Sequence, residues 1–153
     1  MIQMKHILVA TDLGDTADAA LAYGRELAAT FGATLQVLHV AEAHALPLDR
    51  RDAEDAARKQ LDDLLSDDDR ATFRAKGVVL TSSSPARSIV EYAKEAAINL
   101  IVIGTPLHGA MTQLAMGSVA ERVVRTAPCP VLLVQPPANA FIMQETLAAA
   151  ATA

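Results

Sequence analysis

The sequence predicts an α/β domain in which helices cover both faces of a five-stranded parallel sheet. Short β-branched runs alternate with longer segments of helical periodicity, a pattern typical of consecutive βαβ units. The short runs are almost wholly apolar, as expected of strands whose two faces are both covered by helices. Of the 153 residues, 52% are hydrophobic but only 3% are aromatic, so aliphatic side chains must fill the core. This length fits one domain.

The apolar runs define five expected strands. Each is about five to eight residues long in this interpretation, and no surface strand of period two competes with them. The runs are His6–Thr11, Thr34–Ala41, Val78–Ser82, Leu100–Gly104 and Val131–Gln135.

The first helix is expected from Asp15 to Phe31. Asp15 or Thr16 can cap its start, and Gly32 can end it in a left-handed conformation. Its small and apolar positions recur at helical spacing and predict a buried face made of Ala17, Ala20, Leu21, Gly24, Leu27, Ala28 and Phe31.

Two further helical segments follow the second and third strands. We interpret Arg50 to Ala75 as one broken helix, in which the run Ser66–Asp69 can cap a new short piece. The next helix begins after Ser84, because Pro85 is well tolerated at a first helical position. Its expected buried stripe is Ala86, Ile89, Val90, Ala93 and Ala97.

The last helix is expected from Val119 to about Thr126. Ser118 and Glu121 have the spacing of a capping box, in which each side chain bonds the other residue's amide. Pro128 and Pro130 stop this helix and return the chain to an extended conformation.

A ligand site is expected beyond the carboxyl ends of the strands, where open parallel sheets bind their ligands. Asp12 follows the first strand, the second ends near Val40, and Gly104 closes the fourth. Gly117 and Ser118 open the last helix. A helix N-terminus presents unpaired amides and a partial positive charge, so it can hold phosphate without a lysine.

Charge and composition exclude several classes of function. The formal net charge of −5 argues against binding to nucleic acid or to an anionic membrane. The opening apolar run is too short to span a membrane and lacks a signal-peptide pattern, so we expect a cytoplasmic protein without membrane insertion. Cys129 is the only cysteine, which excludes an internal disulfide, and the four histidines match no zinc spacing; no metal ligands are assigned. A nucleophile elbow is also missing around Ser82–Ser84, so no catalytic residues are assigned.

Several motifs together resemble the universal stress protein family from Lys5 to Gln135. They are His6–Asp12 (HILVATD), Leu38–Val40 (LHV), Ile103–Thr105 (IGT), Gly117–Val123 (GSVAERV) and Ala127–Val134 (APCPVLLV). The resemblance implies a doubly wound sheet in the order 3-2-1-4-5, of the adenine nucleotide alpha hydrolase-like kind. It also implies a stress-response role without catalysis and a homodimer through Val131–Gln135. Residues 1–137 would form this domain, and residues 138–153 a C-terminal tail with a helical tendency.

The resemblance also implies a crevice for ATP or AMP with Mg²⁺. Asp12 would contact the ribose or the adenine edge, and Val40 would meet the base through its backbone. Gly104, Gly117, Ser118 and Val119 would hold the phosphates, and Ile103 would also belong to the binding site. Leu107 departs from the family pattern, because it stands where nucleotide-binding members have a second glycine, and its side chain would face the phosphates.

Each site residue also has an explanation without a ligand. Asp12 can form a turn ahead of the first helix, Ser118 can serve only its capping box, and both glycines can serve only their turns. Three functions therefore stay open. The leading one is a nucleotide-binding stress-response module, and the second is a dimeric interaction module that has lost nucleotide. The third, an adenylating or pyrophosphatase enzyme, needs a richer loop than Leu13–Thr16 after the first strand.

Overall fold

β1 (His6–Ala10) lies at the centre of a five-stranded sheet in which every neighbouring pair is parallel. The computed structural model describes residues 1–14, 16–43, 47–105 and 117–135. The other strands are β2 (Thr34–Glu42), β3 (Lys76–Ser82), β4 (Leu100–Gly104) and β5 (Val131–Val134). They lie in the order β3-β2-β1-β4-β5, which confirms the expected topology.

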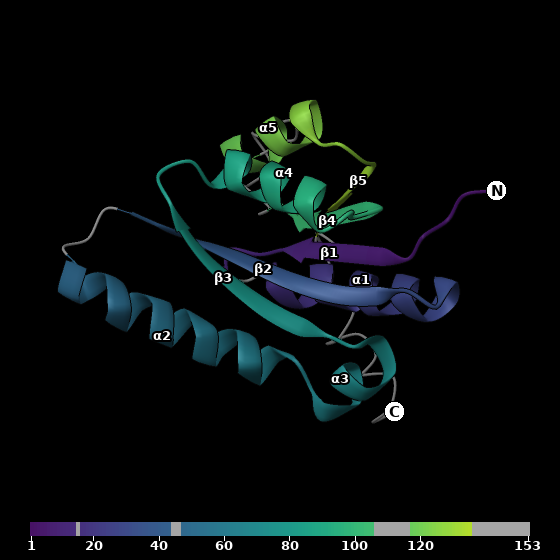
Figure 1. Cartoon of the computed structure of the whole chain (residues 1–153), viewed down its shortest axis with the longest axis horizontal. Coiled ribbons are helices and arrows are strands. Elements are labelled where there is room, and N and C mark those ends of the chain that lie inside the picture. Colours follow the sequence, from purple (N-terminus) through teal and green to yellow (C-terminus); the bar gives the residue numbers. More distant parts are fainter. Residues whose placement is uncertain (15, 44–46, 106–116, 136–153) are drawn as a thin grey trace, which may run out of the picture.

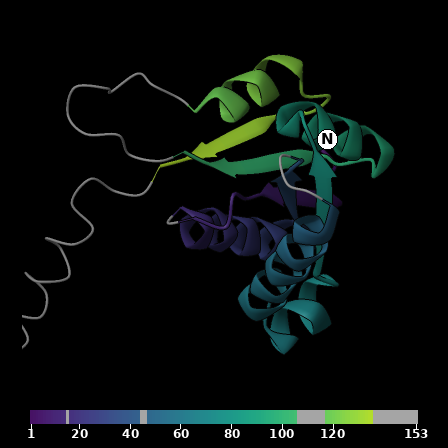
Figure 2. The ribbon, with the colours of Figure 1, turned by 90° about the vertical axis from the view of Figure 1, so that its left-hand side faces the viewer.

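Helices lie on both faces of this sheet (Figures 1 and 2). On one face are α1 (Ala17–Phe31), α2 (Pro47–Leu64) and α3 (Asp67–Phe73). On the other are α4 (Pro85–Glu95) and α5 (Ser118–Thr126). In the part of the chain that the structure describes, no helix is long and apolar enough to cross a membrane.

Alternate side chains of the strands divide the core into two clusters. On β1, Ile7 and Val9 pack with α1, whereas Leu8 and Ala10 pack with residues of α4 and α5. All four are buried, which explains why the strand reads as a continuous apolar run.

Some element boundaries and buried positions differ from the sequence expectation. β3 begins at Lys76, two residues before Val78, because Lys76 and Gly77 pair in register with Gln36 and Val37 of β2. Phe31 does not belong to the buried face of α1, since 47% of it is exposed. Ala97 is not part of the buried stripe of α4; it lies beyond the helix in a left-handed conformation (φ 52°), and Ile98 is buried instead.

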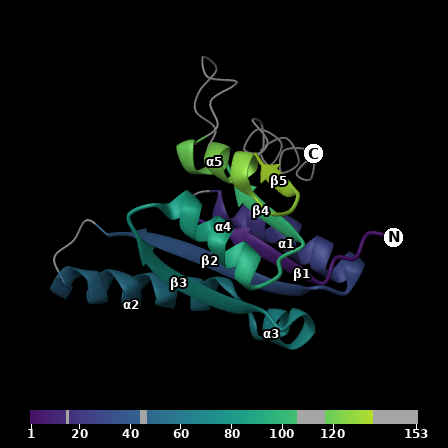
Figure 3. The ribbon, with the colours of Figure 1, turned by 45° about the horizontal axis from the view of Figure 1, so that its top comes forward.

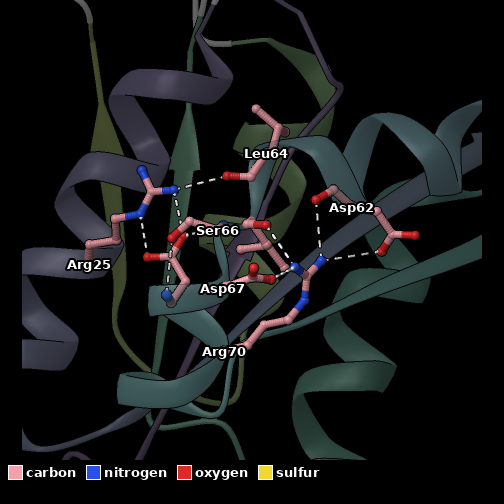
Figure 4. Close-up of polar contacts among 8 residues, drawn as sticks. Arg25, Asp62, Leu64, Ser66, Asp67 and Arg70 are labelled. Atoms are coloured by element: carbon pink, nitrogen blue, oxygen red, sulfur yellow. Dashed lines mark hydrogen bonds and ion pairs between the residues drawn. The ribbon is translucent and has the colours of Figure 1, made fainter.

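The break between α2 and α3 is confirmed, and it is held by a capping box. The Ser66 side chain accepts a hydrogen bond from the Asp69 amide (3.1 Å), and the Asp69 carboxylate accepts one from the Ser66 amide (2.9 Å). Figure 4 shows Arg25 of α1 reaching the same group of residues, where its Nη2 also donates to the Leu64 carbonyl (2.9 Å). On the other side, Arg70 donates to the carbonyls of Leu65 and Asp62 (3.0 and 3.2 Å). These contacts fix α3 against α1 and the end of α2.

Asn99 joins the start of β1 to the start of β4. Its side-chain oxygen accepts hydrogen bonds from the amides of Lys5 and His6, both at 2.9 Å. Its own amide donates to the His6 carbonyl at 2.9 Å. The side chain and the backbone amide of Asn99 together therefore satisfy the backbone groups where β1 enters the sheet.

β3 and β5 are the two edges of the sheet (Figure 3). The carbonyls of Pro130 and Val134 accept hydrogen bonds from the amides of Ile101 and Thr105, on the β4 side. Because backbone groups alternate in direction along a strand, those of Val131 and Leu133 point away from β4. Among the described residues, no strand pairs with this side of β5.

Candidate functional site

A cavity of about 380 Å³ opens at the carboxyl ends of the strands, in the volume range of small-molecule sites. β1, β2 and β4 supply its floor, and the N-terminal ends of α1, α4 and α5 supply its walls. All seven residues proposed from the sequence line it: Asp12, Val40, Ile103, Gly104, Gly117, Ser118 and Val119. The fold therefore brings together residues that are up to 107 positions apart, as 119 is from 12.

Asp12 forms the turn that leads from β1 to α1. Its Oδ1 accepts a hydrogen bond from the Gly14 amide at 2.8 Å, and the Thr11 hydroxyl accepts one from the Leu13 amide at 3.0 Å. Leu13 takes a left-handed conformation within this turn (φ 64°). The local role expected of Asp12 is thus present, and its exposed carboxylate also borders the cavity.

Gly104 is required by packing. A Cβ at this position would lie 2.7 Å from Thr16 Oγ1 and 2.9 Å from Thr16 Cβ, closer than real side chains approach. The end of β4 and the start of α1 therefore touch through a backbone without a side chain. This contact explains Gly104 without any ligand.

Gly117 is in the opposite situation. A Cβ at Gly117 would meet no atom within 4 Å in the described part of the chain, and its φ of −57° suits any residue. No steric demand of the described structure calls for glycine here. The open space lies at the N-terminus of α5, on the wall of the cavity.

The capping box predicted from Ser118 and Glu121 is wrong. Gly117 is the N-cap residue, Ser118 is the first residue of α5, and the helix start has no side-chain cap bond. The Glu121 amide donates to the Gly117 carbonyl (3.0 Å), while the Glu121 carboxylate pairs with Arg125 Nη2 (2.9 Å). The amides of Ser118, Val119 and Ala120 precede the first intrahelical bond, and within the described residues they have no helical partner, as is usual for amides that bind an anion.

The backbone of Val40 faces the same cavity. The last hydrogen bond from β1 to β2 in the described part runs from the Thr11 amide to the Leu38 carbonyl (2.9 Å). Since alternate residues of a strand point the same way, the Val40 amide and carbonyl are directed past the end of β1. A donor and an acceptor side by side are what the edge of a purine base requires.

Sequence reasoning missed other lining residues. His39 lines the cavity, and its Nδ1 donates to the Thr11 carbonyl at 3.0 Å, which fixes the neutral ring as the Nδ1–H tautomer. The only feature of the sequence that could have indicated His39 is its place in the Leu38–Val40 motif at the end of the second strand. Pro85 and Ile89 of α4 complete an apolar wall, and the start of α4 after β3 could have indicated them.

The carboxylate side chains that line the cavity make its surface acidic. Asp12 and Glu42 line it, and no lysine or arginine does so among residues 1–14, 16–43, 47–105 and 117–135. In this same part of the chain, no group of three or more histidine, cysteine or carboxylate side chains could hold a metal ion. Cys129 is half-buried in the core, and burial raises the pKa of its thiol, in keeping with a packing role.

Two predicted features lie outside the described residues. Leu107, where a second glycine was expected, belongs to residues 106–116. The tail, residues 138–153, belongs to the second such segment.

Comparisons with known proteins place this chain in a family. The family model described as the universal stress protein family matches residues 4–135. The chain belongs to the universal stress protein family. A universal stress protein of Thermus aquaticus is 35% identical over 137 residues, covering 86% of this chain and 98% of that protein.

Two solved universal stress proteins share the fold and contain a ligand. One, in complex with cAMP, has a TM-score of 0.65 and 22% identity, with 86% of this chain and 97% of that chain covered. The other, from Archaeoglobus fulgidus in complex with dAMP, has a TM-score of 0.56 and 22% identity, with 87% and 98% covered. This universal stress protein shares its fold with those two structures, and its own cavity lies at the carboxyl ends of the strands.

Proposed function

We propose that this universal stress protein is a non-catalytic, cytoplasmic stress-response module that binds an adenine nucleotide, AMP or ATP, in the cavity. The observation that carries the proposal is the start of α5. There, as far as the described residues go, Gly117 leaves open space in front of helix amides that have no intrahelical partner, on the cavity wall. Solved members of the family in complex with cAMP and dAMP support an adenine ligand of this kind.

The cavity offers separate surroundings for the base and the phosphate. Leu38, Ile89 and Ile103 give an apolar wall for the base, and the Val40 backbone offers a donor and an acceptor for its edge. The phosphate would lie at the amides of Ser118 and Val119. Hydrogen bonds to a charged group contribute about 1.5–3 kcal/mol each, so a few amides suffice for binding without a basic side chain.

Magnesium fits this site only together with the nucleotide. The described residues hold no cation by themselves, whereas Mg²⁺ is commonly held by one or two carboxylates and substrate phosphates. Asp12, and secondarily Glu42, would supply the carboxylate.

The test is a pair of substitutions at Gly117. Gly117→Asp places a carboxylate in the open space before the helix amides, whereas Gly117→Asn has the same shape without charge. Both residues are good N-caps, so neither should destabilise α5. By calorimetry with AMP and ATP, we expect Gly117→Asp to weaken binding at least about tenfold more than Gly117→Asn. Equal binding by both variants would contradict the site, and release of phosphate or pyrophosphate from labelled ATP would contradict the non-catalytic role.

A second candidate is a dimeric interaction module without nucleotide. The open side of β5 favours it, because no strand among the described residues pairs with the backbone groups of Val131 and Leu133 there, and an apolar edge strand invites pairing. Leu107 also favours it, because a leucine at that position would crowd a phosphate. We propose a homodimer through Val131–Gln135 under either function. Absence of AMP and ATP binding by a folded dimer would select this second candidate.

A further inference from the structure

The carboxyl edge of the sheet is poor in basic residues, although the ligand proposed above is an anion. Asp12 and Glu42 add negative charge to the cavity wall. Each further phosphate of a nucleotide adds negative charge, so a diphosphate or triphosphate binds well only where a cation offsets it. No lysine or arginine occurs between the end of each of the first four strands and the next helix, in residues 11–16, 43–46, 83–84 and 105–117.

Arg122 is the basic residue of α5 nearest to the start of that helix. Figure 2 shows that α5 begins beside the ends of β4 and β5. Arg122 follows Ser118 by four residues, which is about 6 Å along the helix axis. Viewed down the axis, it lies about 40° from Ser118 and about 60° from Val119, which both line the cavity. Side chains of a helix tilt toward its N-terminus, so this geometry directs the Arg122 side chain toward the cavity wall.

The two arginines of α5 differ in their partners. Arg125 Nη2 donates to a Glu121 carboxylate oxygen at 2.9 Å. Arg122 is exposed, and its guanidinium has no hydrogen-bond or ion-pair partner within the described residues. A guanidinium binds phosphate well because it offers two parallel hydrogen bonds together with its charge. Arg122 can therefore contact an anion without breaking an ion pair of the described structure.

The other basic side chains of the cavity helices are turned away or already paired. Pro85 and Ile89 bring α4 to the cavity, and Arg87 lies about 160° around the helix from each of them. Arg87 is also bonded to a carboxylate of its own helix (2.9 Å). Lys94 belongs to the last turn of α4, at the end away from the cavity, and Arg25 of α1 is paired with α3. In the described parts of α1, α4 and α5, these contacts leave Arg122 for a ligand.

We propose that Arg122 contacts the phosphates beyond the first one and thereby distinguishes ADP and ATP from AMP. This inference rests on the nucleotide function proposed above. The first phosphate lies at the amides of Ser118 and Val119, and each added phosphate extends the ligand along the exposed side of α5 toward Arg122. The guanidinium then offsets the charge that Asp12 and Glu42 oppose.

Calorimetric titrations of Arg122→Gln in the absence of Mg²⁺ test this contact. Arg122→Gln should weaken ATP binding at least about tenfold and AMP binding by less than about twofold, because only ATP reaches the guanidinium. Arg122→Lys keeps the charge and should recover part of the ATP affinity. Glutamine favours helices and Arg122 is exposed, so the variant should fold normally, which circular dichroism checks.

Arg58→Gln is the matched control. It removes the same charge from an exposed position of α2, whose described residues do not line the cavity. Both affinities of this variant should stay within about twofold of the wild-type values, because surface charges far from a ligand are screened. An equal loss of ATP affinity in Arg58→Gln and Arg122→Gln would overturn the proposal, since it would reflect net charge alone.

The outcomes separate this inference from the proposed function. If the wild type binds nucleotide and Arg122→Gln weakens AMP and ATP equally, or weakens neither, the role of Arg122 is overturned while the function stands. A wild type that binds neither nucleotide would overturn the function and the inference with it. Salt gives a second measure: the ATP affinity of the wild type should fall more steeply with ionic strength than that of Arg122→Gln, because one ionic contact is missing in the variant. Parallel falls would also overturn the role of Arg122.

Discussion

Arg25 and Asp69 form a two-pronged ion pair, although 44 residues separate them in the sequence. Arg25 Nε donates to Asp69 Oδ1 and Arg25 Nη2 to Asp69 Oδ2, both at 2.8 Å. The same carboxylate accepts the Ser66 amide at 2.9 Å. One buried carboxylate thus joins α1 to α3 and takes part in the capping box of α3.

Asp69→Ala should lower the free energy of unfolding by about 2–4 kcal/mol. Two effects contribute to this loss. The capping hydrogen bond is worth about 1 kcal/mol, and removal of the carboxylate also leaves the Arg25 guanidinium without its ion-pair partner. Asp68→Ala, in the exposed first turn of the same helix, is the control and should cost less than about 1 kcal/mol. Urea unfolding followed by circular dichroism measures both. Equal losses would show that the ion pair adds nothing.

The Asp69 pair should also make stability depend on pH. The hydrogen bond from Arg25 is the main cause that lowers the pKa of Asp69 to about 2 from its ordinary 3.8, and the bonds to Ser66 add to it. A carboxylate whose pKa is lower in the folded than in the unfolded state stabilises the folded protein at any pH above the unfolded-state pKa. The contribution of Asp69 to the free energy of unfolding is therefore full above about pH 5 and is lost as the pH falls toward 2. Arg25 is partly exposed, so solvent reduces the effect to about 1–2 kcal/mol. The stability difference between wild type and Asp69→Asn should shrink by this amount between pH 7 and about pH 2.5. A constant difference would contradict it.

Two serines at the starts of helices, Ser66 before α3 and Ser118 as the first residue of α5, should respond differently to alanine. Ser66→Ala removes a side-chain bond to the Asp69 amide and should cost about 1 kcal/mol. Ser118→Ala should change stability by less than about 0.5 kcal/mol, because Ser118 is exposed and α5 has no side-chain cap bond. Thermal unfolding of the two variants compares them directly. A large loss of stability for Ser118→Ala would indicate that the Ser118 side chain does cap α5, contrary to the structure.

Gly24→Ala should destabilise the chain even though alanine favours helices. A Cβ at Gly24 would lie 2.6 Å from Val9 Cγ2, inside the core under β1. Overpacking of this kind costs about 1–3 kcal/mol. Val9→Ala in the same chain should remove part of that cost, and a double-mutant cycle measures the coupling. Additive losses for the two substitutions would show that the contact is not responsible.

Leu133→Lys should prevent dimer formation through β5. The substitution places a charge on the open edge strand, and charged edge residues oppose pairing. Val124→Lys, on an exposed apolar residue of α5, is the control. Light scattering over a range of concentrations gives the masses, and circular dichroism confirms that both variants fold. A Leu133→Lys protein that keeps the mass of a dimer would place the interface elsewhere.

The sequence predicted the strands at the centre of the sheet well because helices bury both faces of β1 and β4. The apolar run of β1 shows no alternation, and all its apolar positions from Ile7 to Ala10 are buried. The start of β3 was missed because Lys76 and Gly77 resemble a loop, and only pairing with β2 shows that they are strand. The composition of a short segment does not show which distant strand it pairs with.

The site was predicted as a set of positions, but the roles of those positions depend on distant neighbours. Gly104 and Gly117 look equivalent in the sequence, yet only Gly104 is crowded, by Thr16 from a segment 88 positions earlier. The serine motifs at Ser66 and Ser118 also look alike, and the helix boundary decides between them: α5 begins at Ser118 itself, so Gly117 takes the cap position. Backbone geometry of this kind is set by tertiary packing.

The central place of β1 has a consequence for synthesis on the ribosome. His6 is joined to Asn99, 93 residues later, so β1 keeps an open apolar edge until β4 has been made. A nascent chain that has completed β2 and β3 holds three of the five strands, with the α1 face and the α4 face both incomplete. Such a chain exposes an edge suited to pairing with another nascent chain, and it is protected only when the segment that begins at Leu100 arrives.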